Sequence, residues 1–469
     1  MNTLTSRLID VCLSDLPGRV DAAALSAASR CLVDSLAVAF AAVGEPPIDL
    51  MRDLYTIGSS TGAAGASTVI GYGEQARPND VALINGTMIS LQLFDDNQAQ
   101  MRGHPSGPLL PAVLAMAEVR DLSVRDALRA FVIGYEVECR FGTLLNPSHY
   151  EIGWHATATQ GTLASVIASG LILGLSAEKM AHALGIAASM TGGIRRNFGT
   201  MTMSLHSGLA ASNGVRAAQM AERGFTADPS IFDGPMNLGE MLSREWTDGP
   251  FADSLPTWGQ PFMIASPGAT FKLYPCGRPP LFAVDCVVEL QRKHGVTADD
   301  IRAVRCDVSY MYPRTLIHSR PTNGLQGKTS LEYCVAAALL DGPPGLASFT
   351  DEAVKRPAIA ALIDRIQVRV PPHLSEDVPA VRKAPFEQPV TIEIDTVDGR
   401  VLSETVAIHK GSPTNPASDD DLTRKFLDCA RPHLGARAED ALAAMRDGAT
   451  SVRALMAMIG ASKAQAVAS

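Results

Sequence analysis

Closely spaced cysteine pairs are absent from this chain, and their absence excludes several classes of protein. Eight cysteines are scattered over 469 residues, and no two of them stand at a C-x-x-C spacing. Zinc ribbons and iron–sulfur proteins need such pairs. The cysteine content is also too low for a disulfide scaffold, so free buried thiols are expected.

The chain also lacks an excess of positive charge. Lys and Arg total 40 against 49 Asp and Glu, which gives a net charge of -9. Proteins that bind nucleic acid or anionic membranes need a surplus of basic residues, so neither partner is expected. A small anionic substrate is still compatible, because it needs only a local cluster of cations.

Long uninterrupted apolar runs are missing as well. Asp10 and Asp15 interrupt the N-terminal segment, where a secretion signal needs an apolar core. The most lipid-like stretch, residues 163–175, has 13 residues and contains serine and glycine, which is too short to span a bilayer. We therefore expect a cytoplasmic protein.

Signature motifs for hydrolases, nucleotides and metals are incomplete. Residues 58–62 (GSSTG) fit the G-x-S-x-G pattern, but the segment that follows is not the amphipathic helix that a hydrolase needs. Gly327-Lys328-Thr329 resembles the end of a P-loop, but Thr322 stands where the first glycine belongs. No H-E-x-x-H motif is present. The sequence therefore predicts no cofactor and no metal.

Apolar patterning predicts the fold class. Hydrophobic residues make up 46% of the chain, enough for two or three domains with sizeable cores. Helical spacing dominates roughly the first 225 residues and returns after Pro416, whereas strand-like alternation occurs between them. We predict a mainly α fold, in which a discontinuous all-helical domain (1–265 and 410–469) carries an inserted, smaller α+β lid domain (266–409).

Individual elements follow from the same patterns. Alternating runs at 390–394 and 401–408 flank the Asp398-Gly399 turn and predict a β-hairpin, and residues 301–308 predict another strand. Ser123, Ser176 and Ser418 are predicted to cap helices. The predicted helices cover 23–43, 78 onward, 108–119, 123–142, 157–173, 176 onward, 205–223, 281–294, 330–340 and 422–429.

Chemically versatile side chains crowd one predicted loop between two helices. Asp95, Asp96, Arg102 and His104 all lie in it. Adjacent carboxylates and a histidine can raise one another's pKa and create a base that works near neutrality. The alternative is an acidic helix end followed by a capped turn at Pro105-Ser106.

Two further segments could bind an anion. His155 precedes the N-terminus of an apolar helix, where unpaired N–H groups and the helix dipole favour negative charge. It could equally be a neutral histidine held by packing. Arg195 and Arg196 lie in a glycine-rich loop and could clamp a carboxylate, or be solvated at the surface. Lys272 and Arg278 lie just past the predicted domain junction, where ligand sites often form.

In this order, these segments resemble the MmgE/PrpD family, which includes 2-methylcitrate dehydratase, cis-aconitate decarboxylase and iminodisuccinate epimerase. The resemblance covers most of the chain and implies a helical domain with an inserted lid, a homodimer, and metal-free chemistry on small di- or tricarboxylates. The phrase 101–106 (MRGHPS) looks most like the epimerase branch. The other matching residues are Asn85-Gly86, Phe94-Asp95-Asp96, Gly134-Tyr135-Glu136, Gly153-Trp154-His155, Phe198-Gly199-Thr200-Met201-Thr202, His206 with Gly208, Lys272 with Tyr274-Pro275, and Ser330-Leu331-Glu332-Tyr333.

Three positions depart from the family pattern. Leu93 stands where the family commonly has an aspartate, Met203 where it has a lysine, and Leu281 near a position that is usually histidine. The expected pocket therefore loses a carboxylate, an ammonium and an imidazole. Because losing one preorganised charge can lower a rate by about 10²–10³, the dehydratase chemistry of the family cannot simply be carried over.

We predict a cofactor-independent enzyme that removes a proton next to a carboxylate of a small polycarboxylic acid. His104 is expected to be the acid or base and His155 its partner or a substrate anchor, with an aspartate orienting a histidine. The predicted catalytic residues are His104, His155, Asp95 and Asp96. The predicted substrate-binding residues are Arg102, Arg195, Arg196, Lys272 and Arg278.

The type of reaction is open between three alternatives. Two protonating groups that flank one carbon suffice for epimerisation, and the likeness of residues 101–106 favours this reading. Elimination of water or loss of CO2, as in a lyase, also needs a leaving group at the neighbouring position. The third alternative is a family member that binds a carboxylate but has lost its chemistry.

Overall fold

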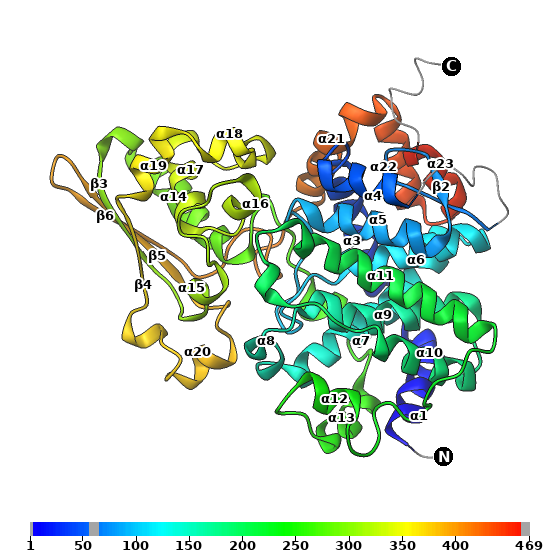
Figure 1. Cartoon of the computed structure of the whole chain (residues 1–469). Coiled ribbons are helices and arrows are strands. Elements are labelled where there is room, and N and C mark those ends of the chain that lie inside the picture. Colours follow the sequence, from blue (N-terminus) through cyan, green and yellow to red (C-terminus); the bar gives the residue numbers. More distant parts are fainter. Residues whose placement is uncertain (1–2, 56–64, 461–469) are drawn as a thin grey trace.

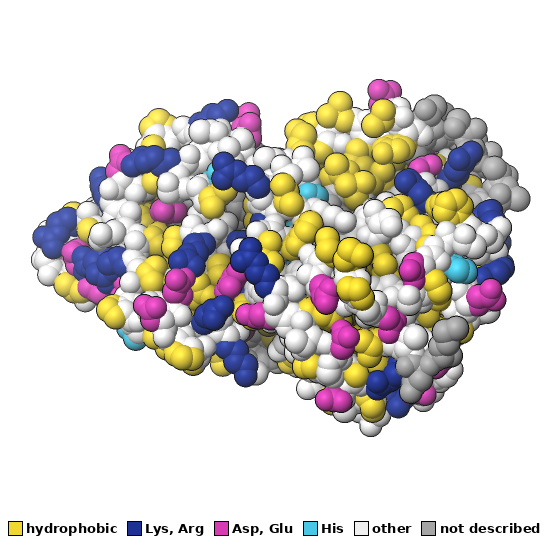
Figure 2. All heavy atoms as spheres, turned by 60° about the horizontal axis from the view of Figure 1, so that its bottom comes forward, with side chains coloured by type: hydrophobic (Ala, Val, Ile, Leu, Met, Phe, Trp, Pro, Cys, Tyr) yellow, Lys and Arg dark blue, Asp and Glu magenta, His cyan; other side chains and the backbone are white. Residues whose placement is uncertain are grey.

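The structure is a computed structural model and describes residues 3–55 and 65–460. Within this part of the chain, helices dominate and form two lobes of unequal size (Figure 1). The surface is notched where the two lobes meet (Figure 2). The hydrolase-like segment 58–62 lies outside the described residues.

Long helices build the larger lobe, and the chain enters this lobe twice (Figure 1). The longer ones are α3 (Ala22–Phe40), α4 (Pro46–Leu54), α5 (Pro78–Leu91), α6 (Ser106–Arg120), α7 (Val124–Leu145), α9 (Ala156–Leu173), α10 (Ala177–Ser189), α11 (Met201–Glu222), α21 (Asp419–Leu434), α22 (Arg437–Asp447) and α23 (Val452–Gly460). The shorter elements are α1 (Leu4–Asp10), η1 (Val11–Asp15), α2 (Leu16–Arg19), β1 (Ser67–Thr68), β2 (Gln75–Ala76), α8 (Ser148–Ile152), η2 (Arg195–Asn197), α12 (Leu238–Leu242), α13 (Asp248–Ser254), η3 (Leu255–Thr257) and η4 (Ile264–Gly268).

The smaller lobe is built on a four-stranded sheet of order β4-β3-β5-β6. Strand β4 runs parallel to β3, and the other pairs are antiparallel. The strands are β3 (Ile301–Asp307), β4 (Ile366–Arg369), β5 (Val390–Thr396) and β6 (Val401–Val406). The helical segments are α14 (Arg278–His294), η5 (Ala298–Asp300), α15 (Met311–Thr315), α16 (Gly324–Gly327), α17 (Leu331–Asp341), η6 (Leu346–Phe349), α18 (Asp351–Val354), α19 (Pro357–Ile363), η7 (Pro372–Leu374) and α20 (Pro379–Lys383).

The predicted hairpin and strand are confirmed. Strand β5 pairs with β6 so that Val390 lies opposite Val406 and Asp395 opposite Val401. Gly399 in the connecting turn has φ 88°, a backbone conformation that favours glycine. Strand β4 was not predicted, because four residues are too short a run to stand out as an alternating pattern.

Serine side chains begin several helices, as predicted. Ser123 accepts a hydrogen bond from the N–H of Asp126 at the start of α7, and Ser176 accepts one from Lys179 at the start of α10. Ser418 forms a reciprocal capping box at the start of α21. Each serine oxygen satisfies an N–H group that the first turn of a helix leaves unpaired.

Helix α11 begins earlier than predicted, at Met201 rather than near residue 205. The N-cap residue, Thr200, makes no side-chain hydrogen bond to the helix, so the start lacks the usual sequence signal. The difference matters for the site, because it places Met203 in the first turn of the helix.

Each lobe has its own hydrophobic core. The larger core gathers buried side chains from Leu8 to Phe271 and again from Ala417 to Ile459. The smaller core runs from Cys276 to Leu402 and lies where α14 and α17 pack against the sheet. The predicted mainly α fold with a smaller α+β part is confirmed, and the domain boundaries at residues 265 and 410 stay a prediction.

Two glycines allow α5 and α11 to pack backbone against backbone. A Cβ on Gly208 would lie 2.1 Å from the carbonyl oxygen of Leu83, and one on Gly86 would lie 2.8 Å from the Cα of Gly208. Any larger side chain at either position would push these helices apart. Their close approach fixes the distance between the loop that follows α5 and the first turn of α11.

Helices α3 and α9 are each long and apolar enough to cross a membrane by length and composition, although residues 163–175 alone are too short. Their most apolar windows are 67% and 83% buried inside the protein, as in core helices. A cytoplasmic location and a homodimer stay predictions.

Candidate active site

A cavity of about 80 Å³ lies between the two lobes. The larger lobe contributes the loop between α5 and α6 and the starts of α9 and α11, and the smaller lobe contributes the start of α14 and the end of α15. The polar lining residues are Ser90, Asn97, Arg102, His104, Tyr150, His155, Arg278, Thr315 and Thr329. The other lining residues are Leu93, Ala99, Phe198, Met203, Gly277, Pro279, Leu316 and Phe386.

His104 is held so that one ring nitrogen is left for a ligand. Its Nδ1 lies 2.9 Å from the backbone carbonyl oxygen of Asp96 and 3.2 Å from Oδ2 of Asp95. Its backbone N–H donates to Oγ1 of Thr157 in α9. Because both neighbours of Nδ1 are acceptors, Nδ1 carries the proton in the neutral ring. The Nε2 lone pair is therefore available to take a proton from a molecule in the cavity.

Asp95 is the buried counter-charge of this histidine. Burial alone would raise the pKa of Asp95, but the charges of His104 and Lys272 outweigh it and hold the pKa below its usual value. Asp95 therefore stays ionised and stabilises an imidazolium at His104. Its position 3.2 Å from Nδ1 is compatible with the orienting role predicted for one of the two neighbouring aspartates.

Asp96 points away from the histidine and holds the start of α6. Its Oδ2 accepts from Oγ of Ser106 at 2.8 Å, and its Oδ1 accepts from the N–H of Ser106 at 3.2 Å. Burial and the nearby carboxylates of Asp34 and Asp95 raise the pKa of Asp96 to about 7. Asp96 thus contributes its backbone carbonyl to His104 and its side chain to the helix.

The raised pKa of Asp96 predicts a pH-dependent stability. Folded Asp96 holds a proton that the unfolded chain has already lost, so its contribution falls as the pH rises from about 4 to about 7 and then levels off. Relative to an Asp96→Asn variant, we expect the wild type to lose about 1 kcal/mol of unfolding free energy per pH unit between pH 5 and pH 7. Urea unfolding of both proteins across this range tests it, and parallel pH curves would contradict it.

His155 forms a buried pair with His206 of α11. The two Nδ1 atoms lie 3.0 Å apart, so one ring must donate and the other accept. Burial, followed by the charges of His206 and His104, holds the pKa of His155 well below its usual value. Gly193 lies against this pair: a Cβ there would lie 3.4 Å from the ring of His206 and would clash with Cβ of Ala158 at 2.5 Å. His206 therefore sets whether Nδ1 or Nε2 of His155 carries the proton.

Replacing His206 tests this pairing. We expect His206→Phe to lower kcat, by less than the roughly 10²–10⁴ that general acid–base catalysis contributes, because His155 remains but its tautomer is no longer fixed. The pKa of His155 should rise, so that the limb of the pH–rate profile that it controls moves to higher pH. His206→Asn keeps a hydrogen-bonding side chain and should recover part of kcat. Equal kcat and an unshifted profile in His206→Phe would refute the pairing.

Arg102 is the cation with least compensation in the cavity. Its Nη2 makes one long hydrogen bond, 3.4 Å, to the carbonyl oxygen of Lys383, and its buried Nη1 has no partner. Burial lowers the pKa of this guanidinium. Arg278 also lines the cavity, but it is already bound to Glu387 at 2.8 Å and to the carbonyl oxygen of Phe386. An incoming carboxylate would find its free partner at Arg102.

The other predicted cations do not line the cavity. Lys272 is fully buried, and its Nζ donates to the carbonyl oxygen of Leu93 at 3.0 Å and lies 3.8 Å from Asp95. The guanidinium of Arg195 stacks on the ring of Tyr150 at 3.6 Å, and its Nη1 donates to the carbonyl oxygen of Tyr150. Arg196 is exposed. The first two can shape the site only through their neighbours.

Two of the three positions that depart from the family pattern face the cavity. Leu93 and Met203 both line it and are 7% and 4% exposed. Leu281 does not line it and is buried in the core of the smaller lobe. The replacements at residues 93 and 203 therefore change the wall of the cavity, whereas the third concerns packing.

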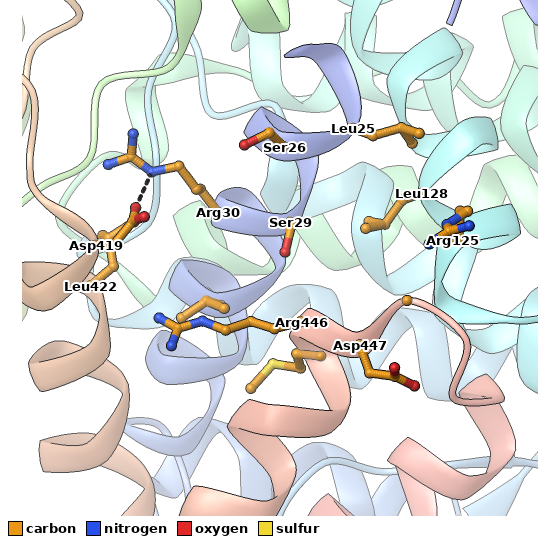
Figure 3. Close-up of a pocket in the computed structure, with 13 residues that line it drawn as sticks. Leu25, Ser26, Ser29, Arg30, Arg125, Leu128, Asp419, Leu422, Arg446 and Asp447 are labelled. Carbon is orange, nitrogen blue, oxygen red and sulfur yellow. Dashed lines mark ion pairs between the residues drawn. The ribbon is translucent and has the colours of Figure 1, made fainter. Parts of the chain in front are cut away.

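A larger hollow of about 350 Å³ lies elsewhere, where α3, α7, α21 and α22 meet (Figure 3). Three arginines line it, and Arg30 pairs with Asp419 at 3.2 Å. The side chains of Arg446 and Arg125 point away from one another (Figure 3). None of the predicted site residues is there, and its lining contains no histidine. This hollow is larger than the interlobe cavity, but it does not bring together the groups of the candidate site.

The metal and nucleotide predictions can be compared with the described residues. Among residues 3–55 and 65–460, no group of three or more His, Cys, Asp or Glu side chains is arranged to hold a metal ion. All eight cysteines are free and buried, as predicted. Lys328, from the segment that resembles a P-loop, is buried and donates to the carbonyl oxygen of Gln92. A P-loop lysine would instead face a phosphate.

Several cavity residues were not predicted from the sequence. Tyr150, Thr315 and Phe386 belong to short segments without a recognisable motif, so no sequence signal pointed to them. His206 appeared only as part of the family likeness. Its spacing from His155 carries no information until α9 and α11 are packed side by side.

Comparison with known proteins gives a consistent result over both lobes. Residues 7–248 match the family model of the MmgE/PrpD N-terminal domain, and residues 274–448 match that of the MmgE/PrpD C-terminal domain. The chain is 29% identical to cis-aconitate decarboxylase of Mus musculus over 417 residues, which is 85% of this chain and 80% of that protein. It is 28% identical to cis-aconitate decarboxylase of Homo sapiens over 375 residues, 77% and 74% of the two chains. It is 26% identical to 2-methylcitrate dehydratase of Cupriavidus necator over 418 residues, 82% of each chain.

Proposed function

The chain belongs to the MmgE/PrpD family, and from this premise we propose that it is a lyase that moves a proton at the carbon next to a carboxylate of a small di- or tricarboxylic acid. One observation carries the proposal: a histidine backed by a buried, ionised aspartate lines the same cavity as an unpaired guanidinium and a second histidine.

The roles follow from these contacts. Arg102 binds one substrate carboxylate and stabilises the enediolate that forms when the neighbouring carbon loses a proton. His104 takes that proton on Nε2, and Asp95 stabilises the resulting imidazolium. His155, which is neutral in its buried pair with His206, offers a hydrogen bond to the substrate.

Either lyase reaction balances with these groups. In a dehydration, the C–H electrons form the C=C bond, and the β-hydroxyl leaves as water with the proton that His104 has taken from the α-carbon. In a decarboxylation, the electrons of the broken C–C bond go to the α-carbon, which is protonated by a histidine as CO2 leaves. Both reactions need a leaving group that an epimerase does not.

The relatives favour the lyase alternative over the epimerase that the likeness of residues 101–106 suggested. The relatives named above are a dehydratase and decarboxylases, and they align with most of this chain. At 26–29% identity the choice between water and CO2 as the leaving group is left to experiment.

A panel of hydroxy and unsaturated polycarboxylic acids, incubated with the enzyme in deuterated water, tests the proposal. We expect an alkene that absorbs in the ultraviolet or released CO2, and neither product with His104→Asn. Deuterium incorporation without a change in composition would indicate an epimerase instead. Binding without turnover or deuterium exchange would indicate a carboxylate-binding protein.

A further inference from the structure

Permanent charge is scarce on the wall of the interlobe cavity. Among the described residues that line it, Arg102 and Arg278 are the only ones with a permanent charge, and no Asp, Glu or Lys is present. The charge of Arg278 is already compensated by Glu387 at 2.8 Å. Lys272 is fully buried behind Leu93, and Arg195 stacks on Tyr150 and donates to Thr315 without lining the cavity itself.

Apolar side chains form a large part of the wall. Leu93 and Met203 come from the larger lobe, and Leu316 and Phe386 come from the smaller lobe. Phe198 lies beside His155, with ring centroids 5.0 Å apart. A hydrocarbon group of a bound molecule would lose its contact with water here, whereas a carboxylate at the same place would meet no further cation in the lining.

The backbone of Leu93 is held in an unfavourable conformation. Its φ of 51° lies in the left-handed region, where leucine is rare and strained. The ammonium of Lys272 donates a hydrogen bond of 3.0 Å to the carbonyl oxygen of Leu93. The side chain of Lys272 has no exposed surface. Strained residues that a structure holds in place tend to occur at ligand sites. The backbone here thus presents an apolar side chain to the cavity in spite of its conformational cost.

We propose that this cavity selects a small dicarboxylic acid with a hydrocarbon substituent and discriminates against a tricarboxylic acid. One carboxylate binds at Arg102 and the second at the Nε–H of Arg278, which has no hydrogen-bond partner although Glu387 pairs with the other end of the guanidinium. The substituent lies against Leu93 and Met203. This inference rests on the proposed function, because it names the substrate class of that same site. Leu93 and Met203 are then the residues that determine specificity.

Two probes with the same succinate core isolate the third group. Tricarballylate carries a carboxymethyl group where 2-propylsuccinate carries a propyl group. We expect the wild-type protein to bind 2-propylsuccinate about 10- to 100-fold more tightly than tricarballylate in isothermal titration calorimetry. Equal affinities, tighter binding of tricarballylate, or no binding of either probe would overturn the proposal.

Substitution at Met203 tests where the substituent lies. Met203→Lys adds a cation of similar length and should reverse the preference toward tricarballylate. Met203→Gln, the matched neutral variant, should weaken binding of 2-propylsuccinate without a reversal. If Met203→Lys folds, as judged by its thermal transition, and still prefers 2-propylsuccinate to the same degree, the placement is wrong. If it does not fold, the wild-type affinity ratio decides.

The outcomes separate this inference from the proposed function. Turnover of a tricarboxylic acid, together with tighter binding of tricarballylate, would support the lyase and overturn the substrate class. The expected affinity ratio without turnover of any alkyl-substituted dicarboxylic acid would support the substrate class and overturn the lyase.

Discussion

Replacing His104 by asparagine is expected to lower kcat by about 10²–10⁴-fold, the range that a positioned general acid or base contributes. Asparagine can still donate toward the carbonyl oxygen of Asp96, which lies 2.9 Å from Nδ1, so the loop should keep its shape. It has no group equivalent to Nε2, so the proton at the substrate carbon has no acceptor. Steady-state kinetics with an identified substrate measure the effect.

Asp95→Asn provides the matched comparison. This change keeps His104 but removes the charge that stabilises its protonated ring, 3.2 Å away. We expect a loss in kcat that is clearly smaller than that of His104→Asn, with little change in KM. A His104→Asn protein with full activity would refute the assignment of the base, whatever the behaviour of Asp95→Asn.

Replacing Lys425 by methionine is expected to lower the free energy of unfolding by about 3–5 kcal/mol, because it leaves a buried carboxylate without its partner. Nζ of Lys425, in α21, lies 2.6 Å from Oδ1 of Asp34 in α3, and these side chains are 4% and 0% exposed. The same ammonium donates to the carbonyl oxygens of Phe94 and Lys272. It therefore joins the returning C-terminal segment to the two segments that hold Asp95.

Two comparisons isolate the cause. The double variant Asp34→Leu with Lys425→Met removes both charges and should regain most of the lost stability, although the two carbonyl oxygens still lack a donor. Arg424→Met, at the exposed neighbouring position, should change the free energy of unfolding by less than about 0.5 kcal/mol. Urea unfolding of the three variants gives these values. A Lys425→Met protein as stable as Arg424→Met would contradict the buried pairing.

Local patterns identified most of the regular elements. The hairpin around Asp398-Gly399 and the serine caps of α7, α10 and α21 rest on interactions within a few residues, so their signals are present in the sequence itself. The start of α11 and the short strand β4 have no such local signal and were not predicted. Both depend on contacts with distant parts of the chain.

The candidate site was predicted in part. His104, His155 and Arg102 are found at one cavity, and Asp95 lies directly behind His104. Lys272 was expected to touch the substrate, but the structure places it behind Leu93. A lysine looks the same in a sequence whether its ammonium faces a ligand or a backbone carbonyl, so spacing could not decide between the two.

By itself, the sequence determined the order of helices along the chain, the inserted sheet, and the small set of histidines, aspartates and arginines from which a site could be made. Residue type and short-range periodicity suffice for this, because helix caps, turns and acid–base chemistry depend on local groups. Tertiary structure alone decided that His155 is paired with His206, that Arg102 is left unpaired, and that Leu93 and Met203 face the same cavity. Those relations join segments that are distant in the sequence, some of them more than a hundred residues apart, and they exist only because buried helices such as α5, α9 and α11 pack in one arrangement.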